Sequence, residues 1–215
     1  MAKKKSPDKS VERRVYGLTI LKAAHQRMRQ LKKLHEPTIH GNKFWTSSYL
    51  LMDFLGYQGL PIGTRVLEAG CGWGLAGIFC AKQFGARVTG VDADPEVFPY
   101  LDLHAEVNRV EIQTRQARFE ELKPVELAAY DVMLAADVCF WDEMVDPLYG
   151  LIEKAAQAGV QQIVLADPGR SPFTQLCERC VENLGGQTKD WNVEGAAATA
   201  SGTLLIIGSL PRKHR

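Results

Sequence analysis

The segment 66–78 constrains the fold of this 215-residue chain more than any other. A short apolar run ends in Glu68, alternating glycines follow, and an apolar pattern at helical spacing begins at Leu75. This order predicts a strand, a tight turn of bare backbone, and a helix. A turn of this kind holds the nucleotide part of a cofactor, so we expect an α/β domain with its site at the turn.

The charge of Glu68 decides between two cofactors that the glycine spacing admits. Residues Gly72 to Gly77 satisfy G-x-G-x-x-G, and Asp92 lies twenty residues beyond Gly72, so the spacing alone admits NAD. A pyrophosphate at the start of the helix would face the carboxylate of Glu68 in a poorly hydrated turn. S-adenosylmethionine has no phosphate and carries an ammonium and a sulfonium, which an acidic side chain attracts. We therefore expect S-adenosylmethionine.

The same segment resembles motif I of the class I (seven-β-strand) S-adenosylmethionine-dependent methyltransferases, E/D-x-G-x-G-x-G. Residues 87–92 resemble the second strand of that family, in which Asp92 would bind both ribose hydroxyls. A carboxylate suits this role because it offers two acceptors to a vicinal diol. A helix cap or Asx turn is the alternative for Asp92, whereas Asp94 is expected to cap a helix with Pro95 at its first position.

We expect one α/β unit, a Rossmann-like, mostly parallel sheet of seven strands with helices on both faces and an antiparallel last strand. The length and a hydrophobic content of 46% are enough for a sizeable core. The predicted strands are 64–68, 87–92, 111–115, 130–135 and 162–166, closed by an antiparallel pair over 186–191 and 203–210. The predicted helices are 44–55, 75–84, 95–108, 144–158 and 173–184.

Charge is distributed unevenly along the chain. Residues 1–33 carry a net charge of +9, and the remaining residues carry −8. We predict a disordered basic tail over 1–10, a basic helical extension over 11–40 with its helix at 11–34, and the methyltransferase domain over 41–215. The extension can contact RNA or an acidic protein surface. A solvated helix at the domain edge is the alternative, because no aromatic residues interleave to stack bases.

Adenine recognition departs from the family pattern. Related enzymes commonly place an acid after the third strand, but Arg118 stands at that position here. Arg118 and Phe119 are therefore candidates for the adenine site, together with the backbone of residues 117–119. Glu120 is near enough to replace the missing acid, although Glu120 and Glu121 also suit a solvated helix start.

The reaction-specific resemblance follows the fourth strand, where Asp137-x-x-Phe140 is similar to the D/E-x-x-Y/F motif of a protein-lysine methyltransferase subgroup. The segment 41–48, with Trp45, resembles the segment that covers the cofactor in that subgroup. The stretch Asp167-Pro168-Gly169-Arg170 is similar to one in members that act on mitochondrial electron-transfer and related proteins. No Pro-Pro pair stands at 137–140, unlike the signature of DNA and glutamine N-methyltransferases, which clamps a planar nitrogen.

The resemblance implies N-methylation of a protein lysine, with Asp137 and Phe140 as the catalytic residues. A lysine amine has a reference pKa of about 10.4 and must lose a proton before it can attack. Asp137 is expected to orient the ammonium while water removes the proton, and Phe140 or Trp141 to stabilise the methylated cation. Alternatively, Asp137 bonds the ammonium of the cofactor and the aromatic residues are walls. The candidate cofactor-binding residues are Trp45, Glu68, Gly70, Cys71, Gly72, Gly74, Asp92, Ala93, Arg118, Phe119, Ala136 and Asp137.

Other functions remain open at this point: a methyltransferase for a small molecule or RNA, an NAD-linked oxidoreductase, or a non-catalytic cofactor-binding partner. The five histidines have no metal-ligand spacing, so no metal is expected. Five cysteines suit a reducing compartment, and Cys177 and Cys180 are expected to pack on a helix. Without a spanning segment or secretory signal, we expect a cytoplasmic protein with no membrane partner and a protein substrate; its oligomeric state stays open.

Overall fold

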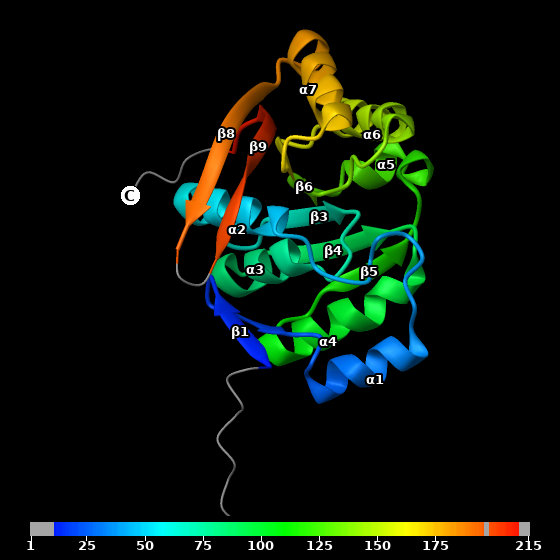
Figure 1. The fold of residues 1–215 in the computed structure, drawn as a ribbon. Helices are drawn as coiled ribbons and strands as arrows, with labels where there is room; N and C mark the ends of the chain where they lie inside the picture. Colours follow the sequence, from blue (N-terminus) through cyan, green and yellow to red (C-terminus); the bar gives the residue numbers. More distant parts are fainter. Residues whose placement is uncertain (1–10, 196–197, 211–215) are drawn as a thin grey trace, which may run out of the picture.

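The computed structural model describes residues 11–195 and 198–210, which form a seven-stranded sheet, a two-stranded hairpin and the surrounding helices (Figure 1). The strands are β1 (Glu12–Val15), β2 (Leu18–Leu21), β3 (Arg65–Ala69), β4 (Arg87–Asp92), β5 (Gln113–Gln116), β6 (Val132–Ala136), β7 (Gln162–Asp167), β8 (Gln187–Glu194) and β9 (Thr199–Gly208). The helices are α1 (Gln26–Leu34), α2 (Ser47–Gln58), α3 (Leu75–Phe84), α4 (Phe98–Asn108), α5 (Pro124–Leu127), α6 (Val145–Gln157) and α7 (Ser171–Leu184).

The large sheet has the strand order β5-β4-β3-β6-β7-β9-β8. Neighbours from β5 to β7 are parallel, and β9 runs antiparallel to both β7 and β8. The predicted Rossmann-like sheet with an antiparallel closing pair is therefore confirmed. Because the order reverses at β3, the carboxyl ends of β3, β4 and β6 surround a crevice at which this class of sheet binds ligands.

Two hydrophobic cores lie on the two faces of the sheet. Along β6, Val132 and Leu134 join the core beneath α2, α3 and α4, whereas Met133 and Ala135 join the core beneath α5, α6 and α7. Successive side chains of a strand point to opposite faces, so a strand that is covered on both sides must be apolar throughout. The helix α3 and the strand β4 have the predicted bounds, and the other elements of the sheet differ by one to three residues at most ends.

The single helix predicted over 11–34 is wrong in its first half. Residues 12–21 form the hairpin β1–β2, and only α1 is helical. The turn is made by Tyr16 and Gly17, whose φ angles are 49° and 75°. Two left-handed residues match the right-handed twist of paired strands, so the chain folds back here rather than continuing as a helix.

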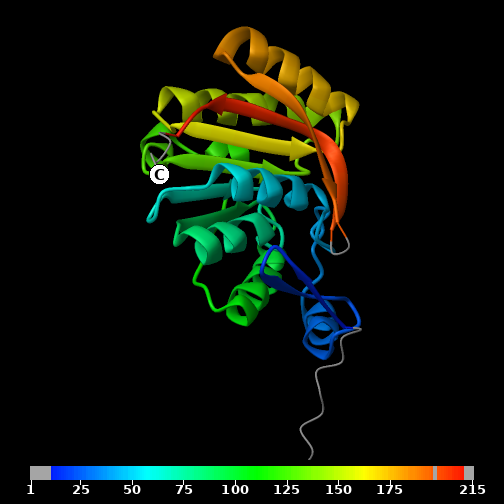
Figure 2. The same cartoon turned by 90° about the vertical axis from the view of Figure 1, so that its left-hand side faces the viewer.

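The hairpin is part of the domain core. Val15, Leu18 and Ile20 are buried in the same cluster as α2 and α3. The side chain of Asn108 on α4 accepts from the backbone N–H of Thr19 and donates to its carbonyl, each at 2.9 Å. Figure 2 shows the hairpin and α1 beside α4, at one end of the molecule. The expected basic extension thus packs against the domain, while the tail predicted over 1–10 lies outside the described residues.

Candidate functional site

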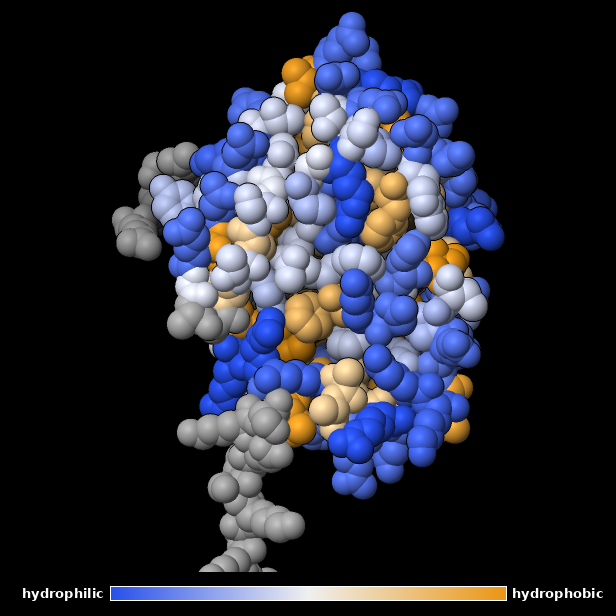
Figure 3. Space-filling view, viewed as in Figure 1, coloured by the Kyte–Doolittle hydropathy of each residue, from blue (hydrophilic) through white to orange (hydrophobic). Residues whose placement is uncertain are grey.

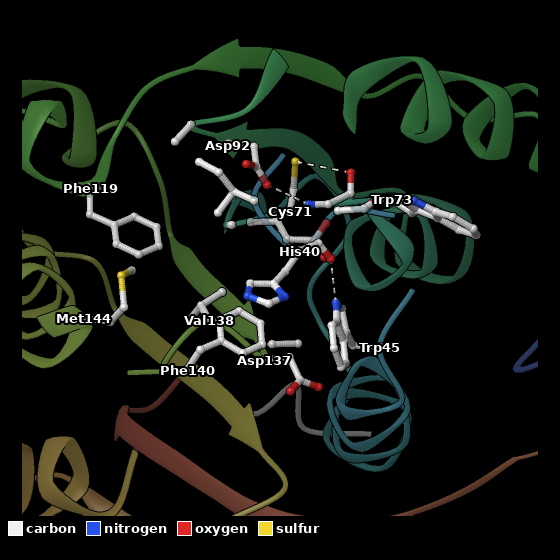
Figure 4. Close-up of a pocket in the computed structure, with 18 of the residues that line it drawn as sticks. His40, Trp45, Cys71, Trp73, Asp92, Phe119, Asp137, Val138, Phe140 and Met144 are labelled. Carbon is white, nitrogen blue, oxygen red and sulfur yellow. Dashed lines mark hydrogen bonds between the residues drawn. The ribbon is translucent and has the colours of Figure 1, made fainter. Parts of the chain in front are cut away.

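One pocket opens at the carboxyl ends of β3, β4 and β6, and every residue predicted for the site lines it. These are Trp45, Glu68, Gly70, Cys71, Gly72, Gly74, Asp92, Ala93, Arg118, Phe119, Ala136, Asp137 and Phe140. The close-up in Figure 4 shows Asp92 at one end, Phe119 and Met144 at the side, and His40, Trp45 and Phe140 at the other end. The structure thus brings the predicted residues together, and their individual roles remain predictions.

The glycine turn presents backbone to this pocket. Gly70, Gly72 and Gly74 have φ angles of 63°, 50° and 66°, a conformation that strongly favours glycine. A Cβ atom at Gly70 would stand 2.5 Å from Cγ1 of Val138, whereas a Cβ atom at Gly72 would meet nothing within 4 Å. Gly70 is therefore needed for packing, and Gly72 leaves open space on the side of the pocket. This cradle fits the close approach of a cofactor.

Glu68 has a partner that the sequence did not predict. Its side chain is buried, and Oε2 accepts from the backbone N–H of Gly77 in the first turn of α3 at 2.9 Å. Burial raises the pKa of Glu68 to about 8, although the hydrogen bond from Gly77 acts in the opposite direction. The prediction that Glu68 holds the cofactor ammonium stays untested. Its carboxyl group does fill the helix N-terminus that a pyrophosphate would use, which is a further argument against NAD.

Asp92 ends β4, and its two carboxylate oxygens accept hydrogen bonds from two different loops, the glycine turn and the loop after β4. Oδ2 accepts from Gly72 N at 2.9 Å, and Oδ1 accepts from Asp94 N at 3.0 Å. Each oxygen keeps a further lone pair for a ligand, which fits the predicted binding of a ribose diol. Burial raises the pKa of Asp92. Asp94 caps the next helical turn through Glu96 N at 3.0 Å with Pro95 at the first position, as predicted.

The adenine end has fewer backbone donors than the sequence suggested. The N–H of Ala117 donates to Asp92 O, and the N–H of Arg118 donates to Glu121. These two N–H groups are therefore already paired, and the prediction that backbone groups of 117–119 pair with the adenine edge stays a prediction for the other groups. The ring of Phe119 lies beside Met144 at one side of the pocket (Figure 4), where a flat base can pack against them.

Residues 35–46 form a segment, here called the strap, that runs from α1 to α2 along the pocket. It is anchored to the loop after β4: Oδ2 of Asp94 accepts from Thr38 N at 2.5 Å and from Ile39 N at 3.1 Å. Burial tends to raise the pKa of Asp94, but the hydrogen bonds from Thr38, Glu96 and Ile39 outweigh it and the pKa is lowered. The anchor is thus an ionised carboxylate that holds the strap over the cofactor end.

Two tryptophans hold the middle of the strap. Trp73, in the glycine turn, donates from Nε1 to Gly41 O at 2.9 Å, and Trp45 donates to His40 O at 3.0 Å. A Cβ atom at Gly41 would stand 2.3 Å from Cγ1 of Val97, so only glycine fits this close approach. Trp45 was predicted inside a helix, but α2 begins at Ser47 and leaves Trp45 on the strap.

Aromatic side chains from the strap and from the loop after β6 meet at the acceptor end of the pocket. The imidazole of His40 stacks on the ring of Phe140, with centroids 4.6 Å apart and planes 26° apart. Trp45 lies 5.6 Å from Phe140, and Trp141 lies 5.0 Å from His40. Sequence reasoning missed His40 because this residue stands just before the segment 41–48 and belongs to no motif of its own.

Asp137 does not point freely into the pocket. Its side chain is 2% exposed, and Oδ1 lies 2.5 Å from Nη2 of Arg170, although the two groups are not aligned for a regular hydrogen bond. Arg170 also pairs with Asp167 at 2.7 Å and lies over the Phe140 ring, 4.8 Å from its centroid. Arg170 was not among the predicted site residues, although the Asp167–Arg170 stretch was a signal for it.

Comparisons with known proteins agree with this geometry. Residues 66–171 match the family described as methyltransferase domain. The chain is 26% identical over 132 residues to the electron transfer flavoprotein beta subunit lysine methyltransferase of Xenopus laevis, covering 61% of this chain and 53% of the relative. It is 30% identical over 89 residues to a ubiquinone biosynthesis O-methyltransferase of Hahella chejuensis, covering 41% and 37%. The chain thus spans about half or less of the length of these curated relatives.

The fold is also shared with solved structures. A tRNA (uracil-54, C5)-methyltransferase of Pyrococcus abyssi, solved with S-adenosyl-L-homocysteine, matches with a TM-score of 0.57 and 17% identity, covering 91% of this chain and 42% of that one. At this identity the likeness shows the fold alone. The segment 66–171 matches the methyltransferase domain family, and S-adenosylmethionine, the cofactor predicted from the sequence, fits the pocket to which this segment contributes most of the lining.

Proposed function

We propose that this chain is an S-adenosylmethionine-dependent N-methyltransferase that methylates a lysine side chain of a protein. The observation that carries the proposal is the composition of the acceptor end. There, aromatic rings line the pocket, and two buried carboxylates, Asp137 and Asp167, stand against one guanidinium. With both carboxylates ionised, this cluster carries one more negative than positive charge. Such a site suits an alkyl cation better than a phosphate or a neutral hydroxyl.

Different residues of the pocket would bind different parts of the cofactor. Asp92 would hold the ribose hydroxyls, the glycine turn would receive the methionine part, and Phe119 with Met144 would enclose the adenine. When bound, S-adenosylmethionine supplies a methyl group that is already activated by a sulfonium. The protein must therefore supply alignment and an acceptor with an available lone pair, which is where most of its catalytic effect would arise.

Asp137 and Phe140 would act on the acceptor from neighbouring positions. The ion pair to Arg170 fixes the carboxylate of Asp137, and Asp137 itself has a left-handed backbone with φ of 57°. Strained residues persist where the surrounding structure determines them, and they gather at functional sites. In the predicted cation–π contact, a methylated ammonium would approach the part of the Phe140 ring that His40 and Arg170 leave uncovered. Support from a relative comes from the Xenopus laevis protein, whose name describes a lysine methyltransferase.

An RNA acceptor is the competing outcome, because basic side chains gather on the surface. Arg29, Lys32 and Lys33 on α1 are exposed, and Figure 3 shows hydrophilic side chains over this helix. Arg27 on the same helix is instead paired with Glu106. We favour the protein acceptor because the described part of this face is a short helix without interleaved aromatic residues for stacking bases.

The proposal includes the setting in which the protein works. A cytoplasmic location is supported by five cysteines that are all unpaired and buried, and a protein partner follows from the proposed lysine acceptor. Cys177 and Cys180 lie on α7, where burial raises the pKa of both thiols to about 12. Within residues 11–195 and 198–210, no helix is long and apolar enough to cross a bilayer.

The test is to incubate the purified chain with methyl-labelled S-adenosylmethionine and host lysate, then separate protein, RNA and small molecules. We expect label in protein, recovered as methyl-lysine after acid hydrolysis and insensitive to ribonuclease. The Asp92→Ala variant serves as the inactive control, since it lacks the ribose acceptor. Label confined to RNA or small molecules would contradict the lysine proposal, and steep loss of transfer with salt would point to RNA.

A further inference from the structure

We propose that His40 is a catalytic residue of this pocket, the group that takes the proton from the acceptor nitrogen. This inference rests on the proposed function, because it assumes that an acceptor with a removable proton enters the aromatic end. It arises from the placement of one imidazole that no predicted motif contains. His40 lines the pocket, and its ring lies over Phe140, the residue that the acceptor is expected to contact (Figure 4).

Most other proton acceptors of the pocket already have partners, and the exception, Glu120, follows Phe119 on a different side of the pocket from His40. Glu68 accepts from Gly77 N, and Asp92 accepts from Gly72 N and Asp94 N. The carboxylate of Asp137 faces Arg170, and its side chain is 2% exposed. Among the described residues, the ring nitrogens of His40 make no hydrogen bond or ion pair, and the residue is exposed. His40 is thus the pocket imidazole that an incoming group can reach.

The backbone around His40 is fixed on both sides. Ile39 N donates to Asp94, Gly41 O accepts from Trp73, and the carbonyl of His40 itself accepts from Trp45. His40 has a φ of 52°, and among the described residues only four other than glycine have a positive φ. Two of these four, His40 and Asp137, line this pocket. A left-handed conformation held by three hydrogen bonds indicates that the strap places this ring rather than leaving it at the surface.

Histidine suits the step because a neutral imidazole both accepts and releases a proton near neutral pH. The ammonium of the acceptor would give one N–H proton to a ring nitrogen of His40, and the freed lone pair would form the new N–C bond. The S–C bond breaks in the same event, and its electron pair stays on sulfur as a neutral thioether. The imidazolium then passes the proton to water, which restores the uncharged ring for the next acceptor.

The charged groups around the ring come from several elements. Lys43 lies on the strap over the Trp45 ring, and Arg170 with Asp137 lies beyond Phe140. The remaining charged or acidic residues that line the pocket are Glu68, Asp92, Arg118 and Glu120. The pH profile of each His40 variant therefore has to be compared with that of the unchanged chain, in which the same charged groups surround position 40.

Two variants separate a chemical role from a packing role. His40→Asn keeps a residue that tolerates the left-handed backbone but has no imidazole, and His40→Phe keeps a flat ring on Phe140 but cannot take a proton. The matched control is His35→Gln on the same strap. The ring of His35 bonds Glu96 at 3.0 Å and does not line the pocket.

The experiment measures initial rates of label transfer from saturating S-adenosylmethionine between pH 6 and 9, to whichever lysate fraction the unchanged chain labels. Removal of a general base typically costs about a hundredfold or more in rate. We expect this loss for both His40 variants, together with loss of the rising limb of the pH profile. The affinity for S-adenosylhomocysteine in calorimetry should change by less than about threefold, and His35→Gln should keep the pH limb.

A second readout does not depend on turnover. Diethyl pyrocarbonate should modify His40 faster than the fully buried His104, and saturating S-adenosylhomocysteine should slow the reaction at His40. An unreactive His40, or a His40→Phe variant with full rate and an unchanged pH limb, would overturn the proposal. Transfer to RNA or a small molecule that still depends on His40 defeats only the lysine acceptor. Absence of transfer to every fraction defeats both proposals.

Discussion

The two ends of the pocket are built in opposite ways. Most of the cofactor end is supplied by residues 68–93, in which the end of β3, the glycine turn, α3 and β4 follow each other along the chain, and Phe119 and Met144 complete it. Its polar groups are satisfied locally, as the bond from Gly72 N to Asp92 illustrates. The acceptor end is assembled from the strap, the loop after β6 and the loop after β7. Its contacts join residues far apart in the chain, such as His40 with Phe140 and Arg170 with Phe140.

This difference indicates which part of the pocket can change its acceptor specificity while cofactor binding is kept. The cofactor end depends on backbone geometry and on two acids, so it accepts few substitutions without loss of binding. The acceptor end depends on side chains such as His40, Phe140 and Arg170, which lie on loops and can vary while the scaffold remains. The segment 66–171 that matches the methyltransferase family contains the whole cofactor end together with Phe140 and Arg170, and of the acceptor end it excludes only the strap.

The largest effect is expected at the cofactor end, from Asp92→Ala. The substitution removes the acceptor for Gly72 N and, if the predicted role holds, two charge-assisted contacts to the ribose, each worth about 1.5–3 kcal/mol. We expect the affinity for S-adenosylhomocysteine to fall more than a hundredfold in calorimetry. Unchanged affinity would show that Asp92 does not bind the ribose. The distinction between a cofactor end and an acceptor end would then lose its support.

Asp137→Asn should affect the acceptor end and leave cofactor binding almost unchanged. Asparagine tolerates the left-handed backbone at this position, so the main change is loss of the charge that faces Arg170. We expect turnover to fall about thirtyfold, or about 2 kcal/mol, while affinity for S-adenosylhomocysteine stays within about threefold. Equal loss of both quantities would move Asp137 to the cofactor end. Arg170→Lys, which keeps a cation, provides the matched comparison.

Glu68→Gln tests how the cofactor end responds to pH. Burial raises the pKa of Glu68 from 4.5 to about 8, so between these values the unfolded chain releases a proton that the folded chain keeps. The free energy of unfolding therefore falls as pH rises through this window, and glutamine removes this contribution. Urea titrations at pH 5 and pH 8 should show a smaller loss for the variant, by at least about 1 kcal/mol. The same loss in both proteins would contradict the burial argument.

The smallest effect is expected from Gly41→Ala, which disturbs the acceptor end without touching its side chains. The new methyl group would meet Val97 and push the strap outward, at a cost of about 1 kcal/mol. We expect turnover to fall about fivefold and the affinity for S-adenosylhomocysteine to stay unchanged. A variant with unchanged turnover would show that the position of the strap does not matter for transfer. Gly150→Ala, at a glycine on α6 with no positive φ and with open space around it, controls for a general effect of glycine replacement.

What could be read from the sequence follows the same division. The bounds of α3 and β4 and the left-handed glycines were predictable because local spacing and a strand–turn–helix order determine them. The pairing of Asp137 with Arg170 could not be predicted from the sequence, because it depends on β6 and β7 lying side by side in the sheet. The hairpin was mistaken for a helix because basic residues obscure the alternation of buried residues over 15–21, and Tyr16 gives no strong turn signal.

The most direct test of the account is a pair of calorimetric titrations of the purified chain, one with S-adenosylhomocysteine and one with NAD. The carboxyl group of Glu68 at the start of α3 and the open backbone at Gly72 predict one site for S-adenosylhomocysteine and none for NAD. Asp92→Ala should abolish that site. Binding of NAD alone would contradict the central claim that this pocket receives a sulfonium cofactor rather than a dinucleotide.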